Sequence, residues 1–252
     1  MRRLLVALVM VASAAALAAG QSLRFGTRAH PVEPNPAYDG QFTFVRLRYG
    51  PPLAMVSQRI PWSHDYPDGE RNFMKIMNEV TYLHPKFTES SVLGLDDPEL
   101  ARHPVAYMAE PGFMFLTDAE AAAFRAYLLK GGFVIFDDFA EDRGGWAAFE
   151  ATFQRILPGV RFYDLEPSHP IFHAFFEIDS FDIVPQMYDV GRPVFRGIFE
   201  DNDPSKRLMA MINFNTDISE FWEFSASGFL PISETNEAYK LGVNYIMYGM
   251  TH

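Results

Sequence analysis

The stretch from Thr117 to Asp138 constrains the fold more than any other, because it combines a helix with a strand buried on both faces. Thr117 and Glu120 have the spacing of a capping box, in which each side chain satisfies a free amide at a helix start. Gly131-Gly132 ends the predicted helix, and Phe133–Phe136 is a continuous apolar run. Such a strand needs helices on both sides of its sheet. The chain should therefore be an α/β protein with a mostly parallel sheet.

The same alternation of apolar runs and helical stripes continues along the chain. Over 73–83, apolar residues recur with helical spacing at Phe73, Ile76, Met77, Val80 and Leu83, which predicts one buried face. The segment 236–250 is apolar nearly all round, which predicts a buried terminal helix. Altogether we predict strands at 42–49, 92–95, 105–108, 133–136, 194–199 and 208–212, and helices at 73–83, 117–130, 146–157 and 236–250.

The N-terminus has the three parts of a secretory signal peptide. Arg2 and Arg3 precede the apolar run Leu4–Ala19, and small residues lead up to a cleavage site near Gly20. The run is shorter than the ~20 residues that a membrane-spanning helix needs. We therefore expect residues 1–20 to be removed on export, which makes the mature protein periplasmic or secreted without a transmembrane segment. Residues 21–40 should form an extended lead-in, and 41–252 a single domain.

Composition excludes several classes of function. The chain has no Cys, so a thiol nucleophile, a Cys-ligated metal and a disulfide framework are absent, and the core alone must stabilise the fold. Its formal net charge is −11 at pH 7. A surface this acidic repels phosphate backbones, so nucleic acid is not an expected partner.

Acidic residues follow three of the predicted strands. Asp96, Glu110 and the pair Asp137-Asp138 stand at carboxyl ends, where open α/β sheets bind ligands. Converging carboxylates would raise one another's pKa or bind a hard divalent cation. The alternative is that they cap helices and turns, as Asp97 before Pro98 would do.

Other polar residues complete the candidate pocket. His64 and Asp65 lie in one aromatic loop, where they act either as a base with its orienting acid or as structural hydrogen-bonding groups. Asn215 and Asp217 follow a strand, in a loop typical of Asx turns that also suits a sugar or cation. His169 and His173 are four residues apart, but Pro170 between them weakens a metal site. We assign no metal ligands and no cofactor from the sequence.

A set of short motifs resembles the bacterial family called domain of unknown function 4159. The resemblance covers nearly all of the mature chain. The motifs are Tyr38-Asp39-Gly40 with Phe42, Trp62-x-His64-Asp65-Tyr66-Pro67, Glu70-x-Asn72, Asp96-Asp97-Pro98, Glu110-Pro111-Gly112, Gly131-Gly132-Phe133, Asp137-Asp138-Phe139, His169-Pro170, Asn213-x-Asn215-x-Asp217 and Tyr239-x-x-Gly242-x-Asn244-Tyr245.

The resemblance implies a fold more than a function. The family looks related to the class I glutamine amidotransferase-like superfamily, which implies a flavodoxin-like three-layer α/β sandwich. No catalytic residue is established for the family. Glutaminase chemistry in the superfamily needs a Cys nucleophile after a central strand, and Glu110 follows the strand where we would expect it. Glutaminase activity is therefore not expected.

Two classes of function stay open. The first is a binding or interaction module of the cell envelope, which recognises a small polar ligand or an envelope protein and is not an enzyme. The second is a hydrolase acting on carbohydrate or envelope material through Glu110, Asp137 and Asp138, with or without a divalent cation. A purely structural subunit is a third alternative. Convergence of the strand-end acids in one place would favour the enzyme, and separate capping roles the binding module.

Overall fold

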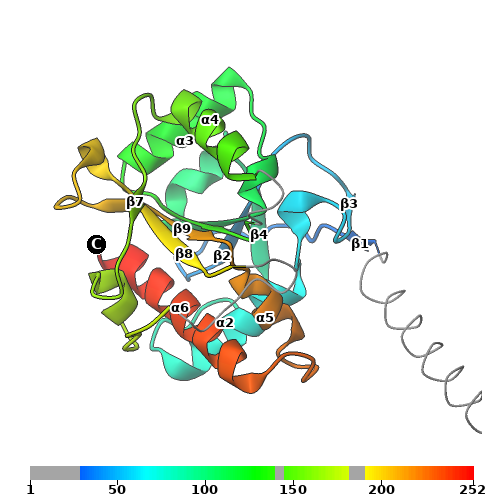
Figure 1. The fold of residues 1–252 in the computed structure, drawn as a ribbon. Coiled ribbons are helices and arrows are strands. Elements are labelled where there is room, and N and C mark those ends of the chain that lie inside the picture. Colours follow the sequence, from blue (N-terminus) through cyan, green and yellow to red (C-terminus); the bar gives the residue numbers. More distant parts are fainter. Residues whose placement is uncertain (1–28, 140–144, 182–190) are drawn as a thin grey trace, which may run out of the picture.

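A seven-stranded, mostly parallel sheet forms the centre of the protein (Figure 1). The computed structural model describes residues 29–139, 145–181 and 191–252. The strands lie in the order β4-β2-β5-β6-β9-β8-β7. The first five are parallel, β8 is antiparallel to β9, and β7 is antiparallel to β8. Their bounds are β2 Phe44–Arg48, β4 Ser90–Gly94, β5 Val105–Ala109, β6 Phe133–Asp137, β7 Tyr163–Asp164, β8 Val194–Phe199 and β9 Leu208–Phe214.

The order of the parallel strands creates a switch point between β2 and β5. The chain passes from β2 outward to β4, returns to the other side of β2 at β5, and then continues to β6 and β9. This 2-1-3-4-5 order is consistent with a flavodoxin-like fold, in which ligands bind beyond the carboxyl ends of the strands at the switch point. The topology therefore predicts a ligand site formed by the loops after β2, β5 and β6.

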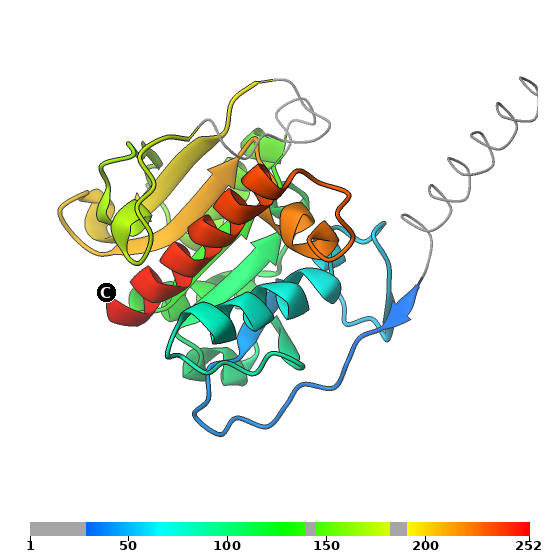
Figure 2. The ribbon, with the colours of Figure 1, turned by 90° about the horizontal axis from the view of Figure 1, so that it is seen from below.

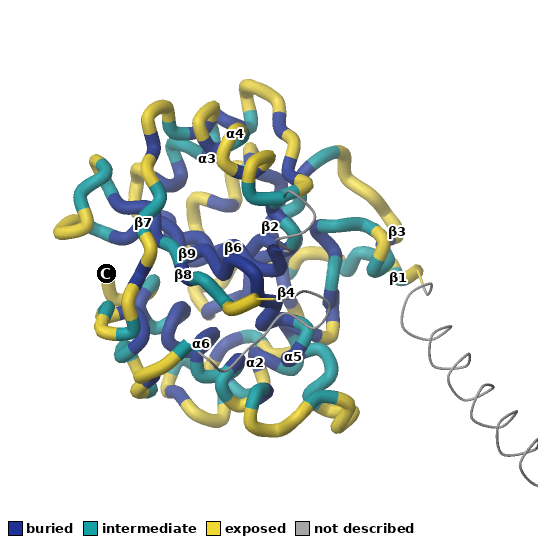
Figure 3. Tube along the Cα trace, viewed as in Figure 1, coloured by how far each residue is buried: buried dark blue, intermediate teal, exposed yellow. Residues whose placement is uncertain are grey.

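Helices cover both faces of the sheet. The face bearing Val45, Met108 and Phe136 packs against α3 and α4, and the face bearing Tyr107 and Ile135 packs against α2, α5 and α6. Figure 2 shows the second layer, and Figure 3 shows that the central strands are buried. The helices are α2 Asp68–Val80, α3 Asp118–Leu129, α4 Gly145–Ile156, α5 Ile218–Phe224 and α6 Ile232–Thr251.

Short elements complete the described chain. Residues 32–43 have no regular secondary structure, and β1, just before them, pairs with β3. The predicted signal peptide lies outside the described residues. Within them, no helix is both long and apolar enough to cross a membrane. The remaining elements are β1 His30–Pro31, β3 Met55–Val56, η1 Pro61–Ser63, η2 Pro98–Arg102, η3 Pro111–Phe113, η4 Pro170–His173 and η5 Glu200–Asn202.

Most predicted elements are present within a few residues of their expected bounds, and the capping box of Thr117 and Glu120 is confirmed. The predicted face of α2 is partly wrong. Val80 is 39% exposed and Ile76 is half-buried, while Glu70 and Met74 are buried beside Phe73. Apolar spacing alone missed this face because a buried carboxylate forms part of it.

The terminal helix α6 fills part of the core, as its composition predicts. Residues 241–246 are buried without interruption, although both ends of the helix are exposed. A Cβ atom at Gly242 would lie 2.6 Å from Trp222 and 2.8 Å from Phe73, whose rings stack at 4.2 Å. The glycine therefore lets α6 approach the contact between α2 and α5.

Candidate functional site

Three neighbouring strands end in strained, polar residues. Glu110 after β5, Asp138 after β6 and Asn215 after β9 have φ angles of 43°, 62° and 55°. Asp65, in the loop that follows η1, has a φ of 62°. A left-handed backbone costs a residue with a side chain free energy, and such residues concentrate at functional sites. These four lie at the carboxyl edge of the sheet, whereas His84, Asp201 and Asn202, which are also left-handed, lie elsewhere.

A buried ion pair positions the loop that carries His64 and Asp65. Arg46, on β2, is 1% exposed and pairs with Glu70 of α2 at 2.8 Å. Its Nη1 donates to the carbonyl oxygens of Trp62 at 3.2 Å and His64 at 2.8 Å. One guanidinium thus joins the central sheet, the helix α2 and the loop, which holds the two candidate residues in place.

The first charged group of the site consists of His64, Glu110 and Asp138, whose nearest ligand atoms all lie within 4.8 Å of one another. His64 Nδ1 is 2.9 Å from Asp138 Oδ2 and 3.7 Å from Asp65 Oδ1. Burial alone would lower the pKa of His64, but the negative charges of Asp65, Asp138 and Glu110 outweigh it and raise this pKa to about 11. At neutral pH His64 is therefore an imidazolium held among carboxylates.

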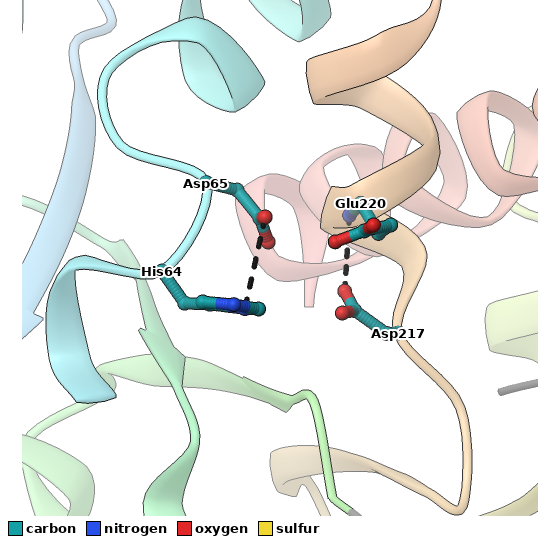
Figure 4. A group of neighbouring side chains, drawn as sticks. All are labelled: His64, Asp65, Asp217 and Glu220. Carbon is teal, nitrogen blue, oxygen red and sulfur yellow. Dashed lines mark hydrogen bonds and ion pairs between the residues drawn. The ribbon is translucent and has the colours of Figure 1, made fainter. Parts of the chain in front are cut away.

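The second charged group consists of Asp65, Asp217 and Glu220 together with His64 (Figure 4), again with ligand atoms within 4.8 Å of one another. Asp217 is the N-cap of α5 and accepts a hydrogen bond from the Glu220 amide at 3.0 Å. Ser219 Oγ hydrogen-bonds to Asp65 and lies 3.1 Å from Asp217. The two groups share His64, so carboxylates from four separate segments meet at one place.

Asp137 is a buried side chain that accepts hydrogen bonds from residues next to the site. Its Oδ1 accepts from Asn213 at 2.8 Å, and its Oδ2 accepts from the amides of Ile218 and Ser219, each at 3.1 Å. Tyr107 OH lies 3.0 Å from the same Oδ2. Burial raises the pKa of Asp137 to about 7, and the charge of Asp138 adds to the rise, against the hydrogen bond from Asn213. Because it accepts from the amides of Ile218 and Ser219, Asp137 also caps the start of α5.

Two glutamates on α5 have pKa values far from their usual range. Burial, followed by the charge of Asp65, raises the pKa of Glu220 to about 8 and that of Glu223 to about 9. Gln58 connects Glu223 to the loop, since its Nε2 donates to Glu223 at 2.9 Å and its Oε1 accepts from the Asp65 amide at 2.8 Å. At neutral pH Glu220 and Glu223 therefore carry protons, which a bound cation or basic ligand could displace.

Two sequence predictions do not join the site. Asp96 follows β4, on the far side of the switch point from β5, and is exposed. It lines a separate cavity of about 470 Å³ with His103 and Lys130. His169 and His173 do not form a pair, because His169 Nδ1 caps η4 while His173 contacts Glu177 and the Pro167 carbonyl oxygen.

Sequence reasoning missed Glu220, Glu223 and Ser219. A signal for Glu220 was available, because Asp217-x-x-Glu220 has the spacing of a helix start, like Thr117-x-x-Glu120. That pattern would have predicted α5 directly after the Asn213–Asp217 loop. No local pattern predicts Ser219 as a site residue, because its partner Asp65 lies 154 residues earlier in the sequence.

Comparison with known proteins identifies a family but no characterised relative. The family model described as domain of unknown function (DUF4159) matches residues 43–250. A search of curated proteins finds no match. The matched range includes both charged groups of the site.

Proposed function

The chain belongs to the family described as domain of unknown function DUF4159, and from this premise we propose that it is a binding module that recognises a small polar ligand at the carboxyl edge of its sheet. The binding residues in this proposal are His64, Asp65, Glu110, Asp138 and Asp217. The family carries no established activity, so the site itself has to support the function.

One observation carries the proposal. Polar residues from the loop after η1, from the ends of β5 and β6, and from the start of α5 converge at the switch point, on backbone that is left-handed at Asp65, Glu110 and Asp138. Caps alone would not require this convergence. Strained backbone and mutually repelling carboxylates both cost stability, and proteins retain such costs mainly at sites that function.

The sequence motifs support a more specific proposal for the superfamily, the domain range and the compartment. We propose a degenerate member of the class I glutamine amidotransferase-like superfamily, with a single domain over 41–252. Since the chain has no Cys, we propose that it lacks the Cys-dependent glutaminase activity of that superfamily. We also propose that residues 1–20 direct export, so that the ligand or the partner protein belongs to the cell envelope.

A ligand screen by thermal shift tests the binding proposal. Sugars, amino acids, peptidoglycan fragments and polyamines are tested against wild type and against Glu110→Gln. A ligand at about 100 times its Kd adds ~2.7 kcal/mol of apparent stability. We expect at least one compound to stabilise wild type and to lose its effect on Glu110→Gln. Equal stabilisation of both proteins by every hit would place binding elsewhere and contradict the proposal.

The strand-end acids converge only in part, because Glu110 and Asp138 meet at His64, whereas Asp96 lies apart and Asp137 accepts hydrogen bonds from the start of α5. This partial convergence makes a hydrolase the second candidate. His64 belongs to both charged groups, so carboxylates of both groups lie close to it. Glycoside hydrolysis uses one carboxyl group as acid and another as base or nucleophile. Release of reducing ends from envelope polysaccharides by wild type, and its loss in Glu110→Gln, would favour the enzyme. Binding of the same polysaccharides without cleavage would favour the module.

A further inference from the structure

One oxygen of Asp65 is buried without a hydrogen-bond donor. The residue is fully buried, and its Oδ2 contacts Ser219 Oγ. Its Oδ1 has no hydrogen-bond partner among the described residues, and the nearest charged nitrogen, His64 Nδ1, is 3.7 Å away. A buried carboxylate oxygen without a donor is costly. Glu220 and Glu223 can hydrogen-bond to Asp65 only while they carry protons, so an ionised cluster leaves this oxygen open to a cation.

A second buried oxygen without a partner lies on the loop that leads to Asp217. Asn215 is 1% exposed, and its Nδ2 donates to the Arg192 carbonyl oxygen at 3.2 Å. Its Oδ1 has no hydrogen-bond partner in the described part of the chain. Carboxylate and amide oxygens are the atoms that hard divalent cations prefer.

The spacing of the carboxylates suits such a cation. The ligand atoms of Asp65, Asp217 and Glu220 lie within 4.8 Å of one another, and Figure 4 shows the three side chains facing one space. Calcium binds oxygen at about 2.3–2.6 Å, so two of its ligands lie at most about 5 Å apart. The spacing of the three groups is thus close to that of oxygen ligands around one ion.

Among the described residues, Arg46 and His64 are positive groups close to Asp65, and both have other carboxylate partners. Arg46 forms its ion pair with Glu70, and His64 pairs with Asp138 at 2.9 Å as well as with Asp65 at 3.7 Å. The amides at the start of α5, which would repel a cation, donate to Asp137. Their partial positive charge is therefore offset before it reaches the three carboxylates.

We infer that Asp65, Asp217 and Glu220 bind one oxygen-preferring divalent cation through their carboxylates. The inference rests on the proposed function, because it makes the cation part of the same ligand-binding edge. The ion would neutralise the buried charges and present open coordination positions to an oxygen-rich polar ligand, such as a sugar with vicinal hydroxyl groups or a carboxylate.

Calorimetric titration of the chelator-treated mature protein with calcium, magnesium and manganese chlorides tests the inference. We expect one equivalent of at least one cation to bind wild type. Asp217→Asn should weaken binding by about tenfold or more while keeping the helix cap, since Asn caps as well as Asp. Glu220→Gln is a second variant outside the capping position. Asp97→Asn is the matched control, because Asp97 caps η2 away from the site.

Each outcome bears on the inference. Loss of affinity in Asp217→Asn and Glu220→Gln but not in Asp97→Asn supports it. Absence of binding to wild type at about 10 mM of each cation, well above the range of known calcium sites, overturns it. Binding that persists in both variants also overturns it. If no cation binds but the ligand screen still yields a compound that depends on Glu110, the proposed function stands and only the cation site falls.

Discussion

At the scale of single residues, the site combines strained backbone with excess negative charge. Glu110 and Asp138 were predicted as strand-end acids, and the structure brings them together around His64. Sequence spacing revealed these residues because parallel strands end at one edge. It could not show that Asp137 and Asp138, adjacent in the chain, have different roles. The first is a buried cap below the site, and the second is a partner of His64.

The raised pKa of Asp137 predicts a pH dependence of stability. The folded-state pKa is about 7, against 3.8 for the free side chain. The folded protein therefore binds a proton that the unfolded chain releases, so the free energy of unfolding should fall as pH rises from about 4 to about 7.

Asp137→Asn should reduce this decline, since the amide does not titrate and can keep accepting from the amides of Ile218 and Ser219. Urea unfolding of both proteins at several pH values, with chelator present, measures the difference. Parallel pH profiles for wild type and variant would show that Asp137 is not protonated in the folded state.

At the scale of elements, α5 connects the site to the helical layer. Asn72 of α2 donates to the carbonyl oxygens of Trp222 at 3.0 Å and Glu223 at 3.2 Å, near the end of α5. The sequence predicted α3, α4 and α6 because caps and long apolar patterns identify them. We did not predict α5, a seven-residue helix that is too short for a clear apolar pattern, although Asp217-x-x-Glu220 has the spacing of its start.

The buried terminal helix predicts a sharp effect of truncation. Deletion of residues 236–252 removes most of α6 and exposes the sheet face and the stacked rings of Phe73 and Trp222. We expect the truncated chain to be absent from the soluble fraction, because a fully buried apolar side chain contributes about 1.5–3 kcal/mol and this helix buries several. A soluble, cooperatively melting truncation would show that α6 is dispensable.

At the scale of the whole molecule, Arg2 and Arg3 followed by the apolar run Leu4–Ala19 predict export. Expression of the full chain in a Gram-negative host should give a periplasmic product whose N-terminal sequence begins close to Gln21. Intact Met1 on a membrane-bound product would contradict cleavage. The fold itself does not report the compartment, so this measurement is independent of the site.

The central claim is that the carboxyl edge sacrifices stability for ligand binding, and two matched variants test it most directly. Asp217 and Asp97 are both Asp N-caps, but Asp217 is buried among other carboxylates, whose charges raise its pKa further after burial has done so. The measurement is the melting temperature of wild type, Asp217→Asn and Asp97→Asn in chelator, and again with calcium or a ligand from the screen.

We expect Asp217→Asn to melt higher than wild type in chelator. Relief of about 1 kcal/mol corresponds to about 2–4 °C in a protein of this size. The same variant should lose the response to added ligand, whereas Asp97→Asn should match wild type in both conditions. A lower melting temperature for Asp217→Asn in chelator, together with an undiminished response to ligand, would contradict the account and leave Asp217 as a helix cap alone.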